Sequence, residues 1–135
     1  MENSTAVTFS SGRVWLDDAN GIVRVEFAPG THQTLEIARE VIAAINSVIG
    51  GLRRPVLVDL THVKVIERDA RSFYGSPEAT ASWPAVAMLA DSPLSTTIAN
   101  IWLAVFSAIQ GKRAKPYKIF SDEAAAVEWL KGFRS

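Results

Sequence analysis

The chain has 135 residues, a length that suits one domain whose core is large enough to fold without disulfides or structural metals. It contains no cysteine, which excludes a disulfide framework, thiol catalysis and cysteine-ligated zinc. Its 14 basic and 14 acidic side chains cancel and form no long run of one sign, so we expect no nucleic-acid partner.

The first residues are polar and do not show a cationic start followed by an apolar stretch, so they do not resemble a signal peptide. We expect residues 1–12 to be a flexible N-terminus and residues 13–135 to form a single domain. The longest apolar stretch, residues 98–109, is shorter than the roughly 20 residues that a membrane span needs. We therefore expect no transmembrane segment and a cytoplasmic protein.

A β-hairpin is predicted at the start of the domain. Two β-rich runs, residues 13–18 and 21–27, flank the pair Asn20-Gly21, and both of these residues tolerate the positive φ that hairpin turns require. In the second run apolar side chains alternate with charged ones, namely Val23, Val25 and Phe27 with Arg24 and Glu26. This alternation predicts a strand with one solvated face.

A helix and a buried strand are predicted next. Thr34 is a suitable N-cap, the following apolar residues recur at spacings of three and four, and Gly50-Gly51 ends the pattern. The run from Pro55 to Leu60 is unbroken and rich in β-branched residues. Such a run is typical of an interior, parallel strand that is buried on both faces.

The rest of the chain continues to alternate between helices and strands. The predicted elements are a helix over 70–80 capped by Asp69, a strand over 85–89, a helix over 93–110 opened by Asp91, a strand over 116–120 and a last helix capped by Ser121. The element order is therefore ββαβαβαβα. It predicts an α/β fold with a mixed, mostly parallel sheet covered by helices.

Three stretches in this order resemble a known family. They are VLVDLTHVKVIERDARSFY, AVAMLADSPLSTTIANIWLAVF and KPYKIFSDEAAAVEWLK. Together they resemble the STAS-like fold in its SpoIIAA-like branch of small bacterial proteins, a fold shared with the CRAL-TRIO lipid-binding domains. The first stretch is similar to the strand-turn-helix that carries a phosphorylated serine in anti-sigma-factor antagonists.

The chain departs from this family at the turn itself. Matching Glu67 to the first acid of the family motif puts Arg68 and Asp69 at the two serines and Ala70 at the glycine. The serine phosphoacceptor is thus absent, and its position is held by Asp69. The carboxylate mimics a phosphoserine only in part, because a phosphoserine carries nearly two charges. Two interpretations stay open, a switch position with fixed charge or a plain helix cap worth about 1 kcal/mol.

The resemblance implies a regulatory or interaction module that binds a protein partner through this strand-turn-helix. The implied partner-binding residues are Glu67, Arg68, Asp69, Arg71, Ser72 and Tyr74. No phosphate loop, nucleophile elbow or His-containing metal set occurs in the sequence, so we expect no cofactor, no metal and no catalytic residue. A small enzyme that uses the strand-end acids Asp59 and Asp91 is the weakest of three hypotheses.

The remaining hypothesis concerns the helix over 93–110, which is apolar nearly all round. A core-facing stripe is predicted from Leu94, Ile98, Ile101, Trp102, Val105 and Ile109. Leu103 and Phe106 widen this stripe, so Trp102, Leu103 and Phe106 are candidates for an apolar contact or ligand surface. Such a surface would suit a carrier or sensor of a small apolar ligand or lipid, and it also offers a contact for a homodimer.

Overall fold

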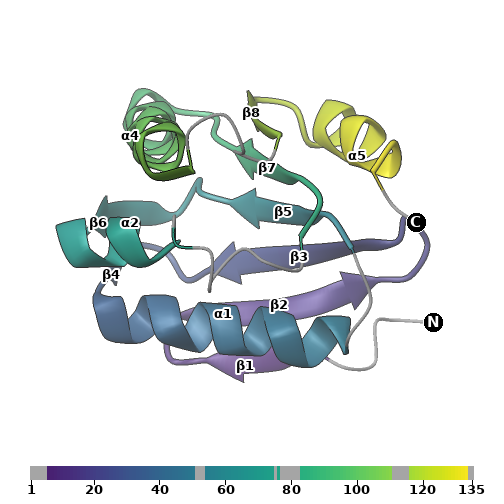
Figure 1. Cartoon of the computed structure of the whole chain (residues 1–135), viewed down its shortest axis with the longest axis horizontal. Helices are drawn as coiled ribbons and strands as arrows, with labels where there is room; N and C mark the ends of the chain where they lie inside the picture. The colour runs from purple at the N-terminus through teal and green to yellow at the C-terminus, as the bar shows by residue number, and fades with distance from the viewer. Residues whose placement is uncertain (1–5, 51–53, 75, 77–82, 111–115, 134–135) are drawn as a thin grey trace.

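A six-stranded sheet forms the centre of the computed structural model, which describes residues 6–50, 54–74, 76, 83–110 and 116–133, without the side chains of 105–110. The strands lie in the order β1-β2-β3-β5-β7-β8 (Figure 1). Their bounds are Val7–Phe9, Gly12–Asp17, Ile22–Phe27, Val56–Asp59, Val86–Leu89 and Tyr117–Phe120. The first three strands pair antiparallel, and β3, β5, β7 and β8 pair parallel.

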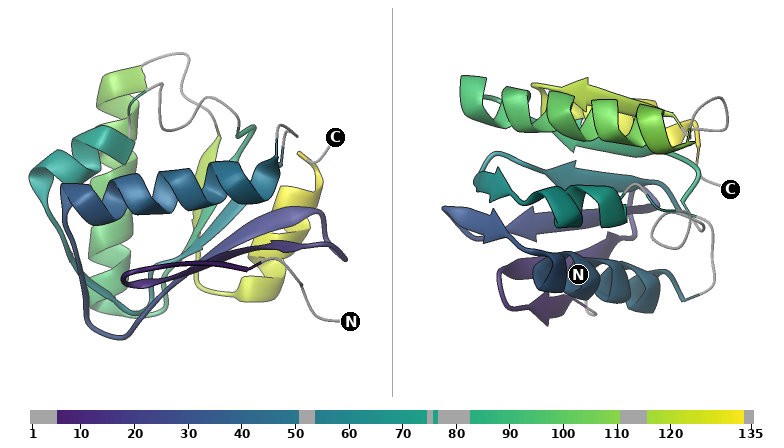
Figure 2. Two further views of the ribbon diagram at one scale, coloured as in Figure 1. Left: turned by 90° about the horizontal axis from the view of Figure 1, so that it is seen from below. Right: turned by 60° about the vertical axis from the view of Figure 1, so that its left-hand side comes forward.

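Helices connect the parallel strands and cover both faces of the sheet. The helices are α1 (Leu35–Ile49), α2 (Arg68–Tyr74), α4 (Pro93–Gln110) and α5 (Glu123–Lys131). Figure 2 shows α1, α2 and α4 lying side by side along one face, where they share one core cluster with the sheet. Helix α5 packs in a separate cluster on the other face. The predicted α/β fold with a mixed, mostly parallel sheet is confirmed.

The predicted alternation in β3 explains how the two faces differ. Val23 and Val25 are buried beneath α1, whereas Arg24 and Glu26 point to the face of α5. The core contacts of α5 on that face lie mainly with β5 and β7. Beyond α5, the same face over β2 and β3 carries charged and aromatic side chains. This division leaves a polar pocket on the sheet, described below.

A second, two-stranded parallel sheet, which the sequence analysis did not predict, extends the structure. It pairs β4 (Thr31–Gln33) with β6 (Val63–Ile66). The backbone N–H groups of Gly30 and Thr31 both donate to the carbonyl of His62, at N–O distances of 3.0 and 3.2 Å. Gly30 has φ +77°, which allows the chain to turn into this pairing. The two short strands carry the chain into α1 and α2 and so position the surface around Glu67.

The hairpin is confirmed, with a different turn from the one predicted. Residues 18–21 connect β2 to β3, and only Gly21 of this turn has positive φ. Asn20 instead donates its side-chain amide to Asp17 at 2.9 Å. The sequence predicts a flexible terminus over residues 1–12, whereas β1 lies within that range and pairs with β2.

The helix starts agree with prediction in one case and differ in three. Thr34 caps α1 by accepting the N–H of Ile37, and Gly50 ends α1 at φ +59°. Ser92, rather than Asp91, caps α4, because its hydroxyl accepts the N–H of Ser95 at 3.1 Å.

Asp122, rather than Ser121, caps α5, because its carboxylate accepts the N–H of Ala125 at 3.0 Å. Helix α2 begins at Arg68, so Asp69 lies inside its first turn. The predicted continuation of α2 to residue 80 falls outside the described residues apart from Ser76.

Candidate functional site

The predicted partner-binding turn lies at the start of α2. The carbonyl of Glu67 accepts the N–H of Arg71 at 3.0 Å, so Glu67 holds the N-cap position that was predicted for Asp69. The Glu67 carboxylate also lies 2.8 Å from Nε2 of His32 on β4. Asp69 accepts the N–H of Ala70 at 2.9 Å, and a carboxylate at this end of a helix is favoured by the helix dipole. Glu67, Arg68, Asp69 and Ser72 are all exposed.

Tyr74 does not belong to this surface. Only 4% of the residue is exposed, and its hydroxyl donates to the side-chain carbonyl of Gln33. Burial raises the pKa of this hydroxyl far above its ordinary value, so it stays protonated as a donor. Its ring meets Trp102 edge-on with centroids 4.8 Å apart. Tyr74 is therefore a core residue that anchors α2 against α4.

The apolar contact surface predicted on α4 packs against the core where the structure describes its side chains, with Trp102 buried and Leu103 half-buried. Trp102 is 3% exposed, and Leu103 packs against the same core cluster. The side chain of Phe106 lies outside the described residues. The apolar cavity between Tyr74, Trp83 and Trp102 has a volume of about 20 Å³. That space holds about one water molecule, so this cavity has no room for a lipid or an apolar ligand.

A different apolar surface appears between β6 and α4. Within the described residues, the exposed large hydrophobic side chains are Val65 (40% exposed), Leu94 (52%) and Ile101 (39%). All three line one groove of about 220 Å³, whose walls also include Ile66, Ile98 and Thr97. Isolated exposed apolar residues are ordinary on a protein surface, whereas a cluster in one groove makes that groove a candidate contact site. We call this feature the β6–α4 groove.

The charges on the β6–α4 groove are of one sign. Lys64 and Arg71 line it, and no acidic side chain of the described residues does so. Across the part of the chain that the structure describes, neither cation has an ion-pair partner. Arg71 is held in place by donating from Nη1 to the carbonyl of Ile66 at 3.2 Å. The groove thus joins an apolar floor to two cations beside the predicted surface of α2.

The groove was not predicted, because the expected core-facing stripe of α4 was only partly right: Ile98 and Trp102 are buried as expected. The stripe that faces the sheet is Ser95, Ile98, Ala99 and Trp102. Leu94 and Ile101 were assigned to the core and are instead exposed. The available signal was residue size, because small residues such as Ser95 and Ala99 let a helix approach its neighbours closely.

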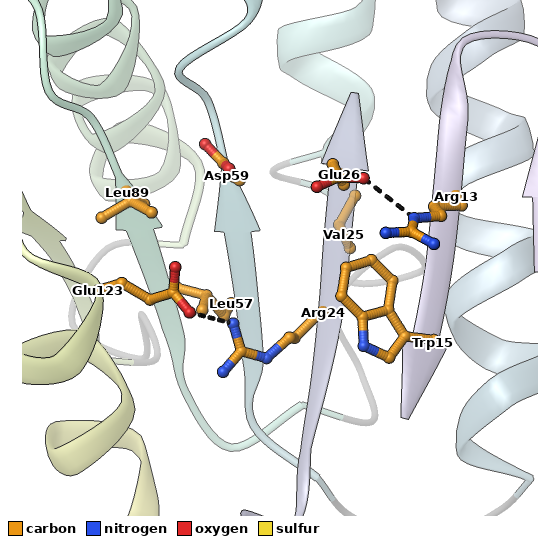
Figure 3. Close-up of a pocket in the computed structure, with 9 residues that line it drawn as sticks. All are labelled: Arg13, Trp15, Arg24, Val25, Glu26, Leu57, Asp59, Leu89 and Glu123. Carbon is orange, nitrogen blue, oxygen red and sulfur yellow. Dashed lines mark hydrogen bonds and ion pairs between the residues drawn. The ribbon is translucent and has the colours of Figure 1, made fainter. Parts of the chain in front are cut away.

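A second pocket, which we call the sheet-face pocket, lies on the opposite face of the main sheet beside α5 (Figure 3). It has a volume of about 190 Å³ and an apolar floor that includes Leu57 and Leu89. Both of its arginines form ion pairs within the chain. Arg13 lies 3.0 Å from Glu26 and stacks over Trp15, with 4.5 Å between the guanidinium carbon and the ring centroid.

Arg24 is the centre of the pairing in the sheet-face pocket. It bonds Asp17 at 2.9 Å and Glu123 of α5 at 2.8 Å, and so ties α5 to the hairpin. Burial by itself raises the pKa of Asp17, but hydrogen bonds from Asn20 and Arg24 and the Arg24 charge outweigh it and lower the pKa overall. This arrangement is that of a structural clamp.

The two strand-end acids proposed as catalytic do not share this pocket. Asp59 lines it and uses one oxygen to accept both the N–H of Thr61, at 2.9 Å, and its hydroxyl, at 2.6 Å. This is the local turn bonding expected of an aspartate after a strand. Asp91 is exposed and does not line the sheet-face pocket. Among the described residues, no group of three His, Asp or Glu side chains is arranged to hold a metal ion.

Comparison with known proteins places the chain in a family. The model of a family described as "Domain of unknown function (DUF7793)" matches residues 14–134. The chain belongs to this DUF7793 family. No curated protein matches the DUF7793 chain. Its described residues contain no helix that is long and apolar enough to cross a membrane.

A solved structure identifies the fold of this DUF7793 protein. It is the crystal structure of an uncharacterized protein from the DUF3478 family with a SpoIIAA-like fold, from Shewanella loihica PV-4. The two chains are 14% identical and superpose with a TM-score of 0.56, over 93% of this chain and 90% of the other. The SpoIIAA-like fold predicted from the sequence is thus confirmed, and at this identity the likeness extends to the fold alone.

Proposed function

We propose that this protein is a non-catalytic interaction module that binds a protein partner through the β6–α4 groove and the adjoining exposed start of α2. The observation that carries the proposal is the gathering of Val65, Leu94 and Ile101 in one groove. Burying such side chains stabilises a complex by about 25 cal/mol per Å² of apolar surface removed from water.

The neighbouring features of the groove support a protein partner over a small substrate. Among the described residues the groove is lined by two cations and no acid, so these residues offer no acid–base pair for proton transfer. Its volume of about 220 Å³ is below the range of roughly 300–1,000 Å³ that is usual for small-molecule sites. The exposed side chains of Arg68, Asp69 and Ser72 continue the surface beyond the groove. We therefore propose that the groove binds another protein and does not bind a small substrate.

The test compares partner recovery by the wild-type chain and by the variant Ile101→Glu. Each is expressed with an affinity tag in the native host, and co-purified proteins are quantified by mass spectrometry. We expect a specific partner to be recovered with the wild type and lost with Ile101→Glu, because the variant puts a charge in the apolar groove. The identified partner, once purified, should bind the wild type and not the variant.

The matched control is Asn100→Glu on the same helix. Asn100 is exposed, does not line the groove and bonds only the carbonyl of Thr96 in its own helix, at 3.0 Å. The Asn100→Glu variant therefore adds the same charge one residue along the helix, outside the groove. The unfolding free energy of both variants should lie within about 0.5 kcal/mol of the wild-type value, as is usual for substitutions of exposed residues. Equal recovery of every partner by Ile101→Glu and wild type would contradict the proposal.

A further inference from the structure

The apolar residues of α4 that line the groove are spaced for contact with another helix. Leu94, Ile98 and Ile101 follow one another at spacings of four and three, the spacing of successive core positions in a coiled coil. We infer that the groove receives an amphipathic helix of a partner protein, one edge of which is lined with acidic residues. This inference rests on the proposed function and names the chemistry of the partner.

The depth of the groove suits a side-chain anchor. A cavity of about 150 Å³ accommodates a benzene molecule, so a groove of about 220 Å³ accepts one large apolar side chain with room to spare. Ile98, which is 7% exposed, forms the floor of the groove. Leu94 and Ile101 line the α4 side, and Val65 lines the β6 side. A Leu or Phe on the partner helix fills this space, and its neighbours one turn away pack on the flanks.

The charges fix the orientation of the incoming helix. Lys64 on β6 and Arg71 on α2 stand on one wall, whereas the α4 wall contributes the uncharged Thr97. A helix lying along α4 therefore meets cations along only one of its edges. Acidic residues on that edge gain two charge-assisted contacts, and basic residues there are repelled.

The same charges disfavour a second copy of this chain as the occupant. In a symmetric dimer the same patch occurs on both partners, so two copies meeting through their grooves would bring four unpaired cations together. The described lining of the groove holds no acid to compensate them. The homodimer through this helix that the sequence suggests is thus the less favourable arrangement.

Two designed peptides test the inference with the full-length chain. Both are stapled helices of about 20 residues, long enough to hold helical structure. They share one Leu stripe at coiled-coil spacing and differ only along one edge, which carries Glu in one peptide and Lys in the other. Binding is measured by fluorescence anisotropy at low and at physiological salt, with wild type, Lys64→Glu, Ile101→Glu and Asn100→Glu.

We expect the acidic peptide to bind the wild type about tenfold more tightly than the basic one, because two exposed pairs change from attraction to repulsion. Lys64→Glu should abolish this preference, Ile101→Glu should abolish binding of both peptides, and Asn100→Glu should leave the preference in place. Added salt should weaken the binding of the acidic peptide and strengthen the binding of the basic one.

Equal affinities of the two peptides, or no binding of either, would overturn the inference. It would also fail if sedimentation shows a wild-type dimer that Ile101→Glu dissociates, since a second copy would then be the occupant. These failures are distinct from failure of the proposed function. A partner that is recovered from the host by wild type and lost with Ile101→Glu supports the groove even when the acidic peptide does not bind.

Discussion

The β6–α4 groove and the sheet-face pocket are similar in volume, about 220 and 190 Å³, and differ in how their charges are satisfied. In the sheet-face pocket Arg13 and Arg24 are ion-paired within the chain, and the apolar floor lies beneath them. In the groove Lys64 and Arg71 have no acidic partner among the described residues, and the apolar side chains are exposed.

This difference separates a structural feature, the sheet-face pocket, from the groove that we propose as a binding surface. Charges that pair within the fold contribute to its stability and leave little to attract a ligand. Charges of one sign beside exposed apolar groups leave both kinds of interaction for another molecule to complete. Substitutions in the sheet-face pocket should therefore affect folding, whereas substitutions in the groove should affect binding.

The strongest test of this contrast places the same change in both regions. Leu57→Glu puts a carboxylate into the floor of the sheet-face pocket, where the residue is 3% exposed, and should cost about 4 kcal/mol or prevent folding. Ile101→Glu should stay within about 0.5 kcal/mol of the wild type. Urea denaturation followed by circular dichroism measures both. Comparable losses in the two variants would show that the groove is part of the core.

A smaller loss is expected from removing the cation of the clamp. Arg24→Met leaves the carboxylates of Asp17 and Glu123 without their partner and should cost about 2 kcal/mol, since a half-buried charged hydrogen bond is worth more than an exposed pair. Chemical denaturation gives the value. The control is Lys118→Met, because Lys118 is exposed and should change stability little. An unchanged midpoint for Arg24→Met would refute the clamp.

Reversal of a groove charge should leave folding intact and weaken the partner complex. Lys64→Glu removes one cation that has no ion-pair partner in the described chain, so its unfolding free energy should change by less than about 0.5 kcal/mol. Affinity for the partner should fall roughly tenfold, mainly at low salt. Titration calorimetry at two salt concentrations checks this. A loss that does not depend on salt would argue against an electrostatic role for Lys64.

The smallest predicted effect is one of pH. The folded state lowers the pKa of Asp17, so its contribution to stability is complete above the ordinary value of 3.8 and is lost as the pH falls below it. The wild type should therefore lose more stability than Asp17→Asn between pH 5 and pH 3. Thermal melts across that range measure the difference. Parallel curves for the two proteins would mean that the bonds from Asn20 and Arg24 do not lower the pKa of Asp17 in the folded state.

The sequence predicted the main sheet well because its signals are local. The alternation around Arg24 and Glu26, the Thr34 cap and the unbroken run before Asp59 each correspond to an observed element. The pair β4 and β6 was missed, although Val63, Val65 and Ile66 favour a strand. A strand of three or four residues is stabilised by its partner, and that partner lies about 30 residues away.

The β6–α4 groove was harder to predict, because α4 is apolar on more than one side. Periodicity shows that such a helix is buried widely but does not show which stripe faces the sheet. For Tyr74 the signal was available, since it follows Ala70 by four residues and lies on the same buried side of α2. The resemblance to partner-binding proteins drew attention to α2, whereas the exposed apolar groups lie next to it.

The most direct test of the groove as the partner site is photocrosslinking in the native host. A benzophenone amino acid replaces Thr97 in the groove in one strain and Trp15 in the sheet-face pocket in another. We expect the partner identified by affinity purification to crosslink from position 97 and not from position 15. Crosslinking of that partner from position 15 alone would contradict it.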